Sequence, residues 1–227
     1  MQHNFYPRLK IIVCVVVYDS TDEIQRWFQA WPFLSKDKLI VYHNYDGEGP
    51  SPGQRAIIEK GPCIYRPRKN QGLDIGAFRD AIRESGDWDV MLWATDDCLP
   101  MRKNLLERIE EIFAKPDVGL VGHQWAEPTH VRTVGFAIRR IVADELVFSE
   151  IKDKDDCFLF EFGPKSLTKQ VWAMGYGIKL LKGNRCYPGY IMGDDGGWMW
   201  DCHWNNWQNS FANFKREFSG ISISLGC

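Results

Sequence analysis

The sequence has no Cys-x-x-Cys pair among its seven cysteines, which stand at positions 14, 63, 98, 157, 186, 202 and 227. An odd number of cysteines without paired spacing argues against both a zinc site and a disulfide framework. We therefore interpret the cysteines as reduced thiols. Because reducing compartments keep thiols free, we expect a cytoplasmic protein.

Long hydrophobic runs are also absent. The apolar stretch IIVCVVVY at residues 11–18 follows basic residues, as the core of a signal peptide does, but it is too short to span a bilayer. It lacks a small-x-small cleavage pattern and continues directly into Asp19 and Asp22. A buried strand explains the run better, and we expect no transmembrane segment.

Neither acidic nor basic residues are in clear excess. The formal net charge is -2, so bulk electrostatics give no reason to expect a nucleic-acid partner. Aromatic residues are by contrast abundant at 14%, and four of the 10 tryptophans fall within residues 198–207. Tryptophan either fills a core or stacks on sugar rings, and this C-terminal group is open to both interpretations.

Strand-like and helix-like segments alternate along the first half of the chain. Apolar runs predict strands at 10–18, 38–44, 63–67, 88–94 and 118–124, and amphipathic spacing predicts helices ending near 31 and spanning 73–85 and 102–115. This alternation predicts an α/β fold, in which a mostly parallel central sheet is flanked by helices. A strand at 130–140 and a helix, a glycine break and a strand over 166–181 follow, without a convincing linker. We expect residues 1–227 to form a single domain.

Polar residues follow four of these strands, in the segments YDS, HNYDG, RPRKNQG and TDD. The carboxyl ends of parallel strands meet at one edge of a sheet, where ligands bind in open α/β folds. The adjacent carboxylates of Asp96 and Asp97 repel each other and need a partner unless water surrounds them. A divalent cation, a basic side chain and a solvated turn are all compatible with the pair.

The motifs YHNYDG, NQGLDIGAFRDAI and VMLWATDDCLPMRKNL follow a first strand that ends in VVVYDS. In this order they resemble the nucleotide-sugar half of GT-A glycosyltransferases of the large inverting family 2. The ATDD segment is similar to the metal-binding segment of spore-coat polysaccharide glycosyltransferases. The segments NQGLDIGAF, TVGFAIRR and FEFGPKSLTKQVWAMGYGIKLL also resemble rhamnan-type and rhamnosyl transferases. The resemblance covers about residues 9–182.

The resemblance implies a GT-A (Rossmann-like) fold with a nucleotide-sugar-binding half over about 1–124 and an acceptor-side half over about 125–227. It implies a metal-dependent inverting glycosyltransferase that uses Mn²⁺ or Mg²⁺. The donor would be a nucleotide-diphosphate sugar of the UDP or dTDP type, and a hexose or deoxyhexose would pass to a glycan or sugar acceptor in polysaccharide biosynthesis.

The resemblance also implies which residues form the site. The nucleotide-sugar-binding residues would be Val16, Tyr18, Asn44, Asp46, Arg66, Lys69, Asn70, Asp74 and Asp96. The metal would be bound at Asp96 and Asp97, with Asp97 holding it directly and Asp96 contacting ribose or a metal-bound water. Asn44 stands where the family usually has an acidic residue, and Thr95 stands where a strict Asp-x-Asp motif has its first carboxylate. The departure at Asn44 leaves the nucleotide base unidentified, and Asp46, two residues further on, is a candidate to replace the acidic residue; the departure at Thr95 concerns the metal motif.

An inverting transfer needs a general base on the acceptor hydroxyl. The resemblance places this base at the acidic residue that opens the acceptor-side helix, and Glu161 fits that place. Aromatic neighbours of Glu161 are expected to raise its pKa. Asp155 and Asp156 are the alternatives, and an ordinary structural role for Glu161 stays open. The histidines at 123, 130 and 203 are candidates for a further metal ligand.

Two other functions are compatible with parts of the sequence. A sugar nucleotidyltransferase would share the fold, but it usually carries a glycine-rich, basic loop after the first strand, and VVVYDSTDEI has neither glycine nor a basic residue. A non-catalytic carbohydrate-binding protein would use the tryptophan-rich tail instead.

Overall fold

The computed structural model describes residues 8–18, 22–30, 39–100, 103–122, 125–126, 130–181 and 199–201. The described strands are β1 (Ile11–Tyr18), β2 (Leu39–Tyr45), β3 (Ile64–Lys69), β4 (Val90–Thr95), β5 (Cys98–Pro100), β6 (Val118–Gly122), β7 (Trp125–Ala126), β8 (His130–Val131), β9 (Gly135–Arg139), β10 (Gly177–Leu180) and β11 (Met199–Asp201). The described helices are α1 (Asp22–Ala30), α2 (Pro52–Lys60), α3 (Leu73–Glu84), α4 (Leu105–Phe113), α5 (Arg140–Ala143), α6 (Lys154–Phe162) and α7 (Leu167–Ala173).

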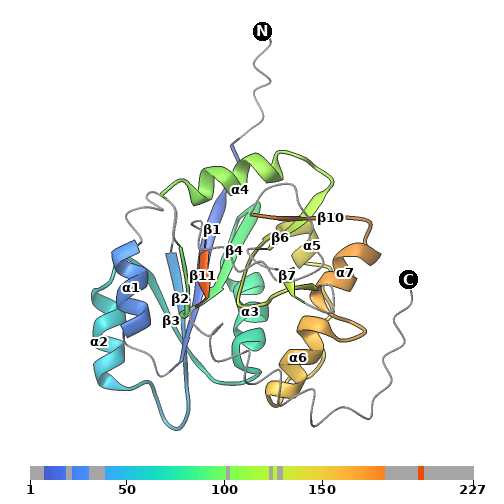
Figure 1. Cartoon of the computed structure of the whole chain (residues 1–227). Helices are drawn as coiled ribbons and strands as arrows, with labels where there is room; N and C mark the ends of the chain where they lie inside the picture. The colour runs from blue at the N-terminus through green and yellow to red at the C-terminus, as the bar shows by residue number, and fades with distance from the viewer. Residues whose placement is uncertain are drawn as a thin grey trace.

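A seven-stranded sheet forms the centre of the molecule, with strand order β10-β6-β9-β4-β1-β2-β3 (Figure 1). Strand β1 is parallel to β2 and β4, and β3 and β10 also pair with parallel neighbours. Strand β9 runs antiparallel between β4 and β6. The α/β arrangement with a mostly parallel sheet is therefore confirmed, and the second half of the chain adds strands to it.

Two apolar layers hold helices against the two faces of this sheet. Alternate residues of β1 explain the division, since Val13, Val15 and Val17 pack in one layer and Ile12, Cys14 and Val16 in the other. Helices α1, α2 and α4 contribute to the first layer, and α3, α5, α6 and α7 to the second. A strand covered on both faces must be apolar at every position, which accounts for the continuous run at residues 11–17.

The antiparallel direction of β9 determines which residues lie beside the polar carboxyl end of β4. Residues 130–140 form two short strands separated by a turn, where the sequence predicts a single strand. Because β9 is antiparallel to β4, its first residue pairs with Ala94 near the end of β4. The turn at 132–134 therefore lies beside the aspartate pair, at the side of the sheet where the parallel strands have their carboxyl ends, which we call the carboxyl edge.

The charged run KDKDDC forms the start of α6. The side chain of Asp153 accepts a hydrogen bond from the Asp156 backbone N–H and caps the helix. As a result, Glu161 lies in the last turn of α6, and its expected position at the opening of a helix is wrong.

Strand β11, in the C-terminal region, pairs antiparallel with β5, the strand that follows the two aspartates. Of the tryptophan group, only Trp200 falls in this strand, and Trp198, Trp204 and Trp207 lie outside the described residues, as do His123 and His203.

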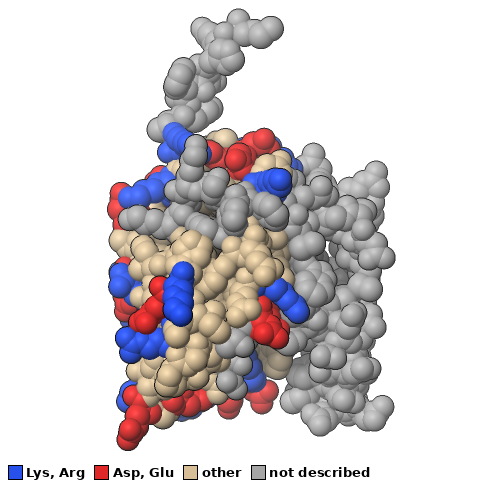
Figure 2. All heavy atoms as spheres, turned by 90° about the vertical axis from the view of Figure 1, so that its left-hand side faces the viewer, with Lys and Arg blue, Asp and Glu red and all other residues tan. Residues whose placement is uncertain are grey.

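The described part of the chain contains no helix with the length and hydrophobicity that a bilayer crossing requires. Cys14, Cys63 and Cys157 are free thiols. On the face that carries α1 and α2, acidic and basic side chains are interspersed (Figure 2). That face therefore has no large field of one sign.

Candidate functional site

The aspartate pair is held at the carboxyl edge by backbone hydrogen bonds on both sides. The Asp96 N–H donates to the Val16 carbonyl of β1 at 3.0 Å, and the Thr95 N–H donates to the Val134 carbonyl at 2.9 Å. The Thr95 hydroxyl donates to the same Val134 carbonyl at 3.2 Å and also to Asp97 Oδ1. The end of β4 is thus fixed between β1 and the turn before β9.

The two carboxylates differ in their surroundings. Asp97 is only 7% exposed and accepts a hydrogen bond from the Thr95 hydroxyl. Asp96 Oδ2 is buried and has no hydrogen-bond partner among the described residues. Burial, and then the charge of Asp97, raise the pKa of Asp96 to about 7, although the Tyr18 backbone N–H opposes the shift. A buried carboxylate oxygen beside a second carboxylate favours a positive partner.

These residues fit a hard divalent cation. No group of three or more His, Cys, Asp or Glu side chains that could hold a metal occurs in the described part of the chain. Mg²⁺ and similar ions need only one or two protein carboxylates when water and substrate phosphates complete their coordination. A cation at this point would satisfy Asp96 Oδ2 and reduce the repulsion between the two aspartates.

Two of the predicted nucleotide-binding residues meet beside the pair. The Tyr18 hydroxyl donates to Asp46 Oδ2 at 2.6 Å, and the Tyr18 side chain is 49% exposed. An exposed ring next to a carboxylate can stack on a base while the carboxylate accepts from a ribose or base donor. Val16 differs, because its side chain is buried in the core and its carbonyl already accepts from Asp96.

Asn44 lies at the centre of a buried network at the end of β2. Its Nδ2 donates to Asn70 Oδ1 and to the Leu73 carbonyl, both at 3.1 Å, and its Oδ1 accepts from Arg68 Nη1 at 2.6 Å. Arg68 also binds Asp80 Oδ2 at 2.9 Å. The side chain of Asn44 therefore holds the loop between β3 and α3.

Glycines in the NQGLDIG motif are explained by this loop. Gly72 has φ +75, the left-handed region that favours glycine. A Cβ at Gly76 would lie 2.1 Å from the Gln71 carbonyl oxygen, so only glycine lets the first turn of α3 approach the loop this closely. Leu73, between them, also has positive φ at 52°. The motif thus encodes a tight entry into α3 at the carboxyl edge.

The other predicted nucleotide-binding residues occupy different positions. Lys69 is exposed at the end of β3, whereas Arg66 is three residues earlier, which at 3.3 Å per residue is about 10 Å from that end. Asp74 lies in the first turn of α3, 3.8 Å from Lys154 Nζ and 3.5 Å from Cys157 Sγ. The start of α6 therefore packs beside the start of α3.

Glu161 is buried in a polar cluster behind the turn at 132–134. Its Oε2 accepts from the Thr133 N–H at 2.9 Å and from the Thr133 hydroxyl at 2.8 Å, and its Oε1 lies 3.3 Å from His130 Nε2. Burial alone would raise the pKa of Glu161, but the hydrogen bond to His130, the charge of Arg132 and the Thr133 N–H together lower it to about 2. The expected rise in its pKa is therefore wrong.

A continuous chain of contacts leads from Glu161 to the aspartate pair. Glu161 binds Thr133, the adjacent Val134 carbonyl accepts from Thr95, and Thr95 donates to Asp97. The sequence gives little sign of this arrangement, since Thr133 is an ordinary polar residue in HVRT. Its position before a strand could have indicated a turn, but the direction of that strand could not be read from the sequence.

The sequence matches neither a protein-family model nor a curated protein. Solved structures do share the architecture. A mannosyltransferase from Pyrobaculum calidifontis, in complex with GDP-Man and Mn²⁺, has a TM-score of 0.56 and 18% identity; the match covers 76% of this chain and 55% of that one. S. aureus TarS 1–349 has a TM-score of 0.56 and 11% identity over 95% of this chain and 67% of that one. The chain has the GT-A fold.

The structure of a cytidylyltransferase from Leptospira borgpetersenii serovar Hardjo-bovis is also similar to that of this GT-A chain. Its TM-score is 0.54 and its identity 11%, over 95% of this chain and 99% of that one. At these identities the likeness establishes the fold alone. The reaction must therefore be argued from the residues at the carboxyl edge.

Within this GT-A fold, Asp155 and Asp156 lie in the first turn of α6. Asp156 Oδ2 accepts from the Lys152 N–H at 2.8 Å, whereas Asp155 is exposed. The fold therefore brings Tyr18, Asp46, Asp96 and Asp97 to neighbouring strand ends. It leaves Arg66 further down β3, and it places Glu161 behind the turn.

Proposed function

We propose that this chain is a metal-dependent, inverting glycosyltransferase that moves a sugar from a nucleotide-diphosphate sugar to a hydroxyl of a glycan or sugar acceptor. The observation that carries the proposal is the buried Asp96 Oδ2, beside Asp97 at the end of β4, which receives no hydrogen bond from any residue that the structure describes. The GDP-Man and Mn²⁺ in the structurally similar mannosyltransferase support the same assignment.

In this proposal Asp96 and Asp97 hold Mn²⁺ or Mg²⁺, which when bound supplies positive charge that stabilises the departing diphosphate. Tyr18 and Asp46 contact the base and ribose of a UDP- or dTDP-type donor, and Lys69 pairs with a phosphate. Asn44 and Asn70 act by holding the loop that leads to Asp74. We assign the reaction to polysaccharide biosynthesis in the cytoplasm, which the free thiols of the chain support.

Calorimetric titration with UDP and dTDP, each with and without Mn²⁺, tests the metal site. We expect Mn²⁺ to tighten nucleotide binding to the wild-type protein and to have no such effect on Asp97→Ala. The matched control is Asp87→Ala, which removes an exposed carboxylate that pairs with Lys10. Nucleotide binding that responds to Mn²⁺ equally in Asp97→Ala and in the wild type would contradict the proposal.

Three carboxylates remain candidates for the general base. Glu161 is the residue that the resemblance selects, but its Oε2 already accepts two hydrogen bonds from Thr133. To take a proton from an acceptor, this oxygen would have to give up one of them. Asp155 is exposed at the start of α6, and Asp156 keeps one oxygen engaged with Lys152.

Paired variants separate a base from a residue that only positions the turn. Loss of a general base lowers turnover by about 100-fold to 10,000-fold while nucleotide binding persists. If Glu161 is the base, Glu161→Gln will show this loss and Thr133→Val will not. If Glu161 positions the turn, the two variants will lose turnover to a similar extent, and Asp155→Asn or Asp156→Asn will show the large loss. The anomeric configuration of the product, followed by NMR, tests inversion.

A second candidate function is sugar nucleotidyl transfer, because the cytidylyltransferase matches nearly its whole length. That reaction releases pyrophosphate from a nucleoside triphosphate, whereas sugar transfer releases a nucleoside diphosphate. An assay of both products with the same protein decides between them. Glycan binding that needs neither metal nor nucleotide would instead indicate a non-catalytic carbohydrate-binding protein.

A further inference from the structure

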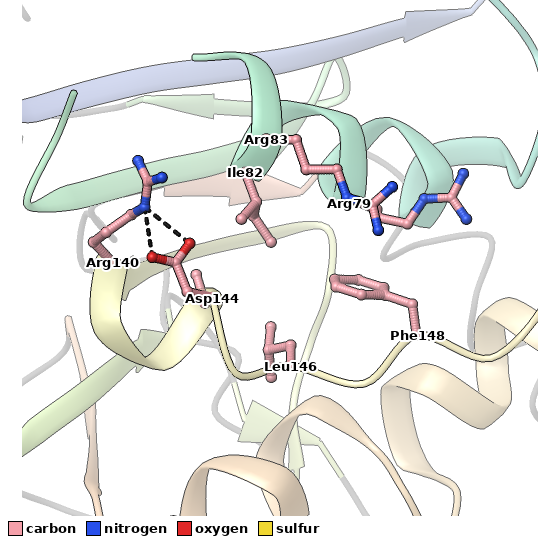
Figure 3. A pocket seen from close by; sticks show the side chains of 8 residues that line it. Arg79, Ile82, Arg83, Arg140, Asp144, Leu146 and Phe148 are labelled. Atoms are coloured by element: carbon pink, nitrogen blue, oxygen red, sulfur yellow. Dashed lines mark hydrogen bonds and ion pairs between the residues drawn. The ribbon is translucent and has the colours of Figure 1, made fainter. Parts of the chain in front are cut away.

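A cleft of about 270 Å³ lies between α3, α5 and the segment that follows α5 (Figure 3). It is lined by Arg79, Ile82, Arg83, Arg140, Ala143, Asp144, Leu146 and Phe148. The Arg140 N–H donates to the carbonyl of Asp89, just before β4, whereas Asp96 follows that strand. Asp89 and Asp96 are seven residues apart, which at 3.3 Å per residue is about 23 Å, so the cleft is separate from the aspartate pair.

Arginine dominates the charge of this cleft. Three arginines and one aspartate line it, so its formal charge is 3 − 1 = +2. Arg79 and Arg83 are four residues apart on α3 and therefore lie on one face in successive turns, where like charges repel. Figure 3 shows both side chains extending toward the Phe148 end of the cleft, while Arg140 lies at the other end.

Among the described residues, a carboxylate lies within hydrogen-bonding distance of only one of these three arginines, Arg140. Arg140 Nε binds both carboxylate oxygens of Asp144, at 2.9 Å and 2.8 Å, and its guanidinium lies 4.8 Å from the ring centroid of Trp88. Arg79 Nε is buried without a hydrogen bond to any described residue. Its nearest carboxylate oxygen is Asp80 Oδ1 at 3.6 Å.

The remaining charges offer little further compensation. The other oxygen of Asp80 is occupied by Arg68 at 2.9 Å. Arg83 is exposed and has no hydrogen bond or ion pair with any residue that the structure describes. Within the described part of the chain, Arg79 thus has one carboxylate partner at 3.6 Å and Arg83 has none, so both guanidinium groups are available to a bound anion.

An apolar wall stands next to these guanidinium groups. It is formed by Ile82, Leu146 and Phe148. The Phe148 ring stacks on Phe160 with centroids 5.1 Å apart and meets Phe78 edge-on at 5.8 Å. These contacts connect the wall to the aromatic core.

We propose that this cleft binds a phosphomonoester that carries a compact apolar group. A phosphomonoester is close to a dianion at neutral pH, which matches the +2 charge of the lining. Planar guanidinium groups bind its oxygens in pairs, and the Phe148 wall takes the apolar group. Sites for larger ligands generally occupy about 300–1,000 Å³, so this cleft suits a molecule smaller than a nucleotide sugar.

Calorimetric titration of the full chain with phenyl phosphate, inorganic phosphate and phenol tests the proposal. We expect phenyl phosphate to bind most tightly, because only it engages both the arginines and the apolar wall. Arg83→Glu and the double variant Arg79→Gln/Arg83→Gln should each weaken binding by about 10-fold to 100-fold, the equivalent of one or more lost charge-assisted hydrogen bonds. An unchanged midpoint of thermal unfolding shows that each variant is folded.

The matched control is Arg108→Gln, because Arg108 is a half-buried arginine, as Arg79 is, and pairs with Glu111 on α4, across the sheet. It should leave the Kd for phenyl phosphate unchanged. Absence of saturable binding, or equal Kd values for the wild type and the double variant, would overturn the proposal.

Vesicles that contain phosphatidic acid, compared with neutral vesicles, separate a lipid from a soluble source of the phosphomonoester. Binding of phenyl phosphate without binding of these vesicles identifies a soluble ligand, and tighter binding of the vesicles identifies a lipid headgroup. In both cases the double variant must lose binding for the proposal to stand. A nucleotide sugar with Mn²⁺ should not compete, since its proposed site is at the other edge of the sheet.

Discussion

Replacement of Glu161 by glutamine should destabilise the protein strongly at neutral pH. The contacts with His130, Arg132 and Thr133 lower the pKa of Glu161 from 4.5 to about 2. At about 1.4 kcal/mol per pKa unit, this shift corresponds to about 3 kcal/mol of stability. The value applies to a side chain that is only 7% exposed, so solvent screening reduces it little.

The pH dependence gives the prediction a sign. Because the folded-state pKa of Glu161 is lowered, its contribution is fully present above the unfolded-state pKa of about 4.5 and is lost as the pH falls toward 2. Urea unfolding of the wild type and Glu161→Gln should therefore differ by about 3 kcal/mol near pH 7, and the difference should shrink between pH 4.5 and pH 2.

Glu145→Gln provides the control, since Glu145 is exposed in the segment after α5 and should change stability by less than about 0.5 kcal/mol. A Glu161→Gln protein as stable as the wild type at pH 7, or a difference that does not vary with pH, would refute this account of the buried cluster.

Three further predictions concern the carboxyl edge. Burial raises the pKa of Asp96, so the ionised side chain destabilises the folded protein increasingly as the pH rises toward 7. In urea titrations without metal, Asp96→Asn should therefore be more stable than the wild type at pH 8 and about as stable as the wild type below pH 4. Arg68→Gln breaks the network around Asn44, so it should lower the free energy of unfolding in urea by about 2–4 kcal/mol and weaken UDP or dTDP binding. The same change at an exposed arginine on α2 should have neither effect. Gly76→Ala forces a Cβ against the Gln71 carbonyl and should lower the midpoint of thermal unfolding, while Gly53→Ala, which meets only a side-chain oxygen at 3.9 Å, should not.

The layered fold could be predicted because periodicity reports burial. Strands β1 and β4 are apolar at nearly every position, and β2 over its first four residues, as strands covered on both faces must be, and α4 has a strong apolar stripe. The α6 helix was harder to predict from KDKDDC, because a run of charges is as common in a solvated loop as in a capped first turn. The pairing of β11 with β5 joins residues about a hundred positions apart, and no local pattern indicates it.

The candidate site could be predicted only where its residues follow parallel strands. Tyr18 ends such a strand, and Asp46 and the aspartate pair come directly after one, so the parallel topology alone brings them to one edge. Arg68 could not be distinguished from Arg66, since both are arginines on the same face of β3 and only the position of Asp80 on α3 shows which one is buried. The direction of the pKa shift at Glu161 likewise depends on three partners that are distant in sequence.

The reversed strand β9 explains how the two halves of the chain come to share one edge. A parallel β9 would have placed its first residue at the opposite edge of the sheet, and Thr133 with it. Because β9 runs antiparallel to β4, the turn before it reaches the end of β4, where the Val134 carbonyl accepts from Thr95. Glu161 on α6 then contacts that same turn through Thr133. We therefore expect changes to the α6 cluster to reach the aspartate pair through the position of this turn, which is why Thr133→Val is the informative partner for Glu161→Gln.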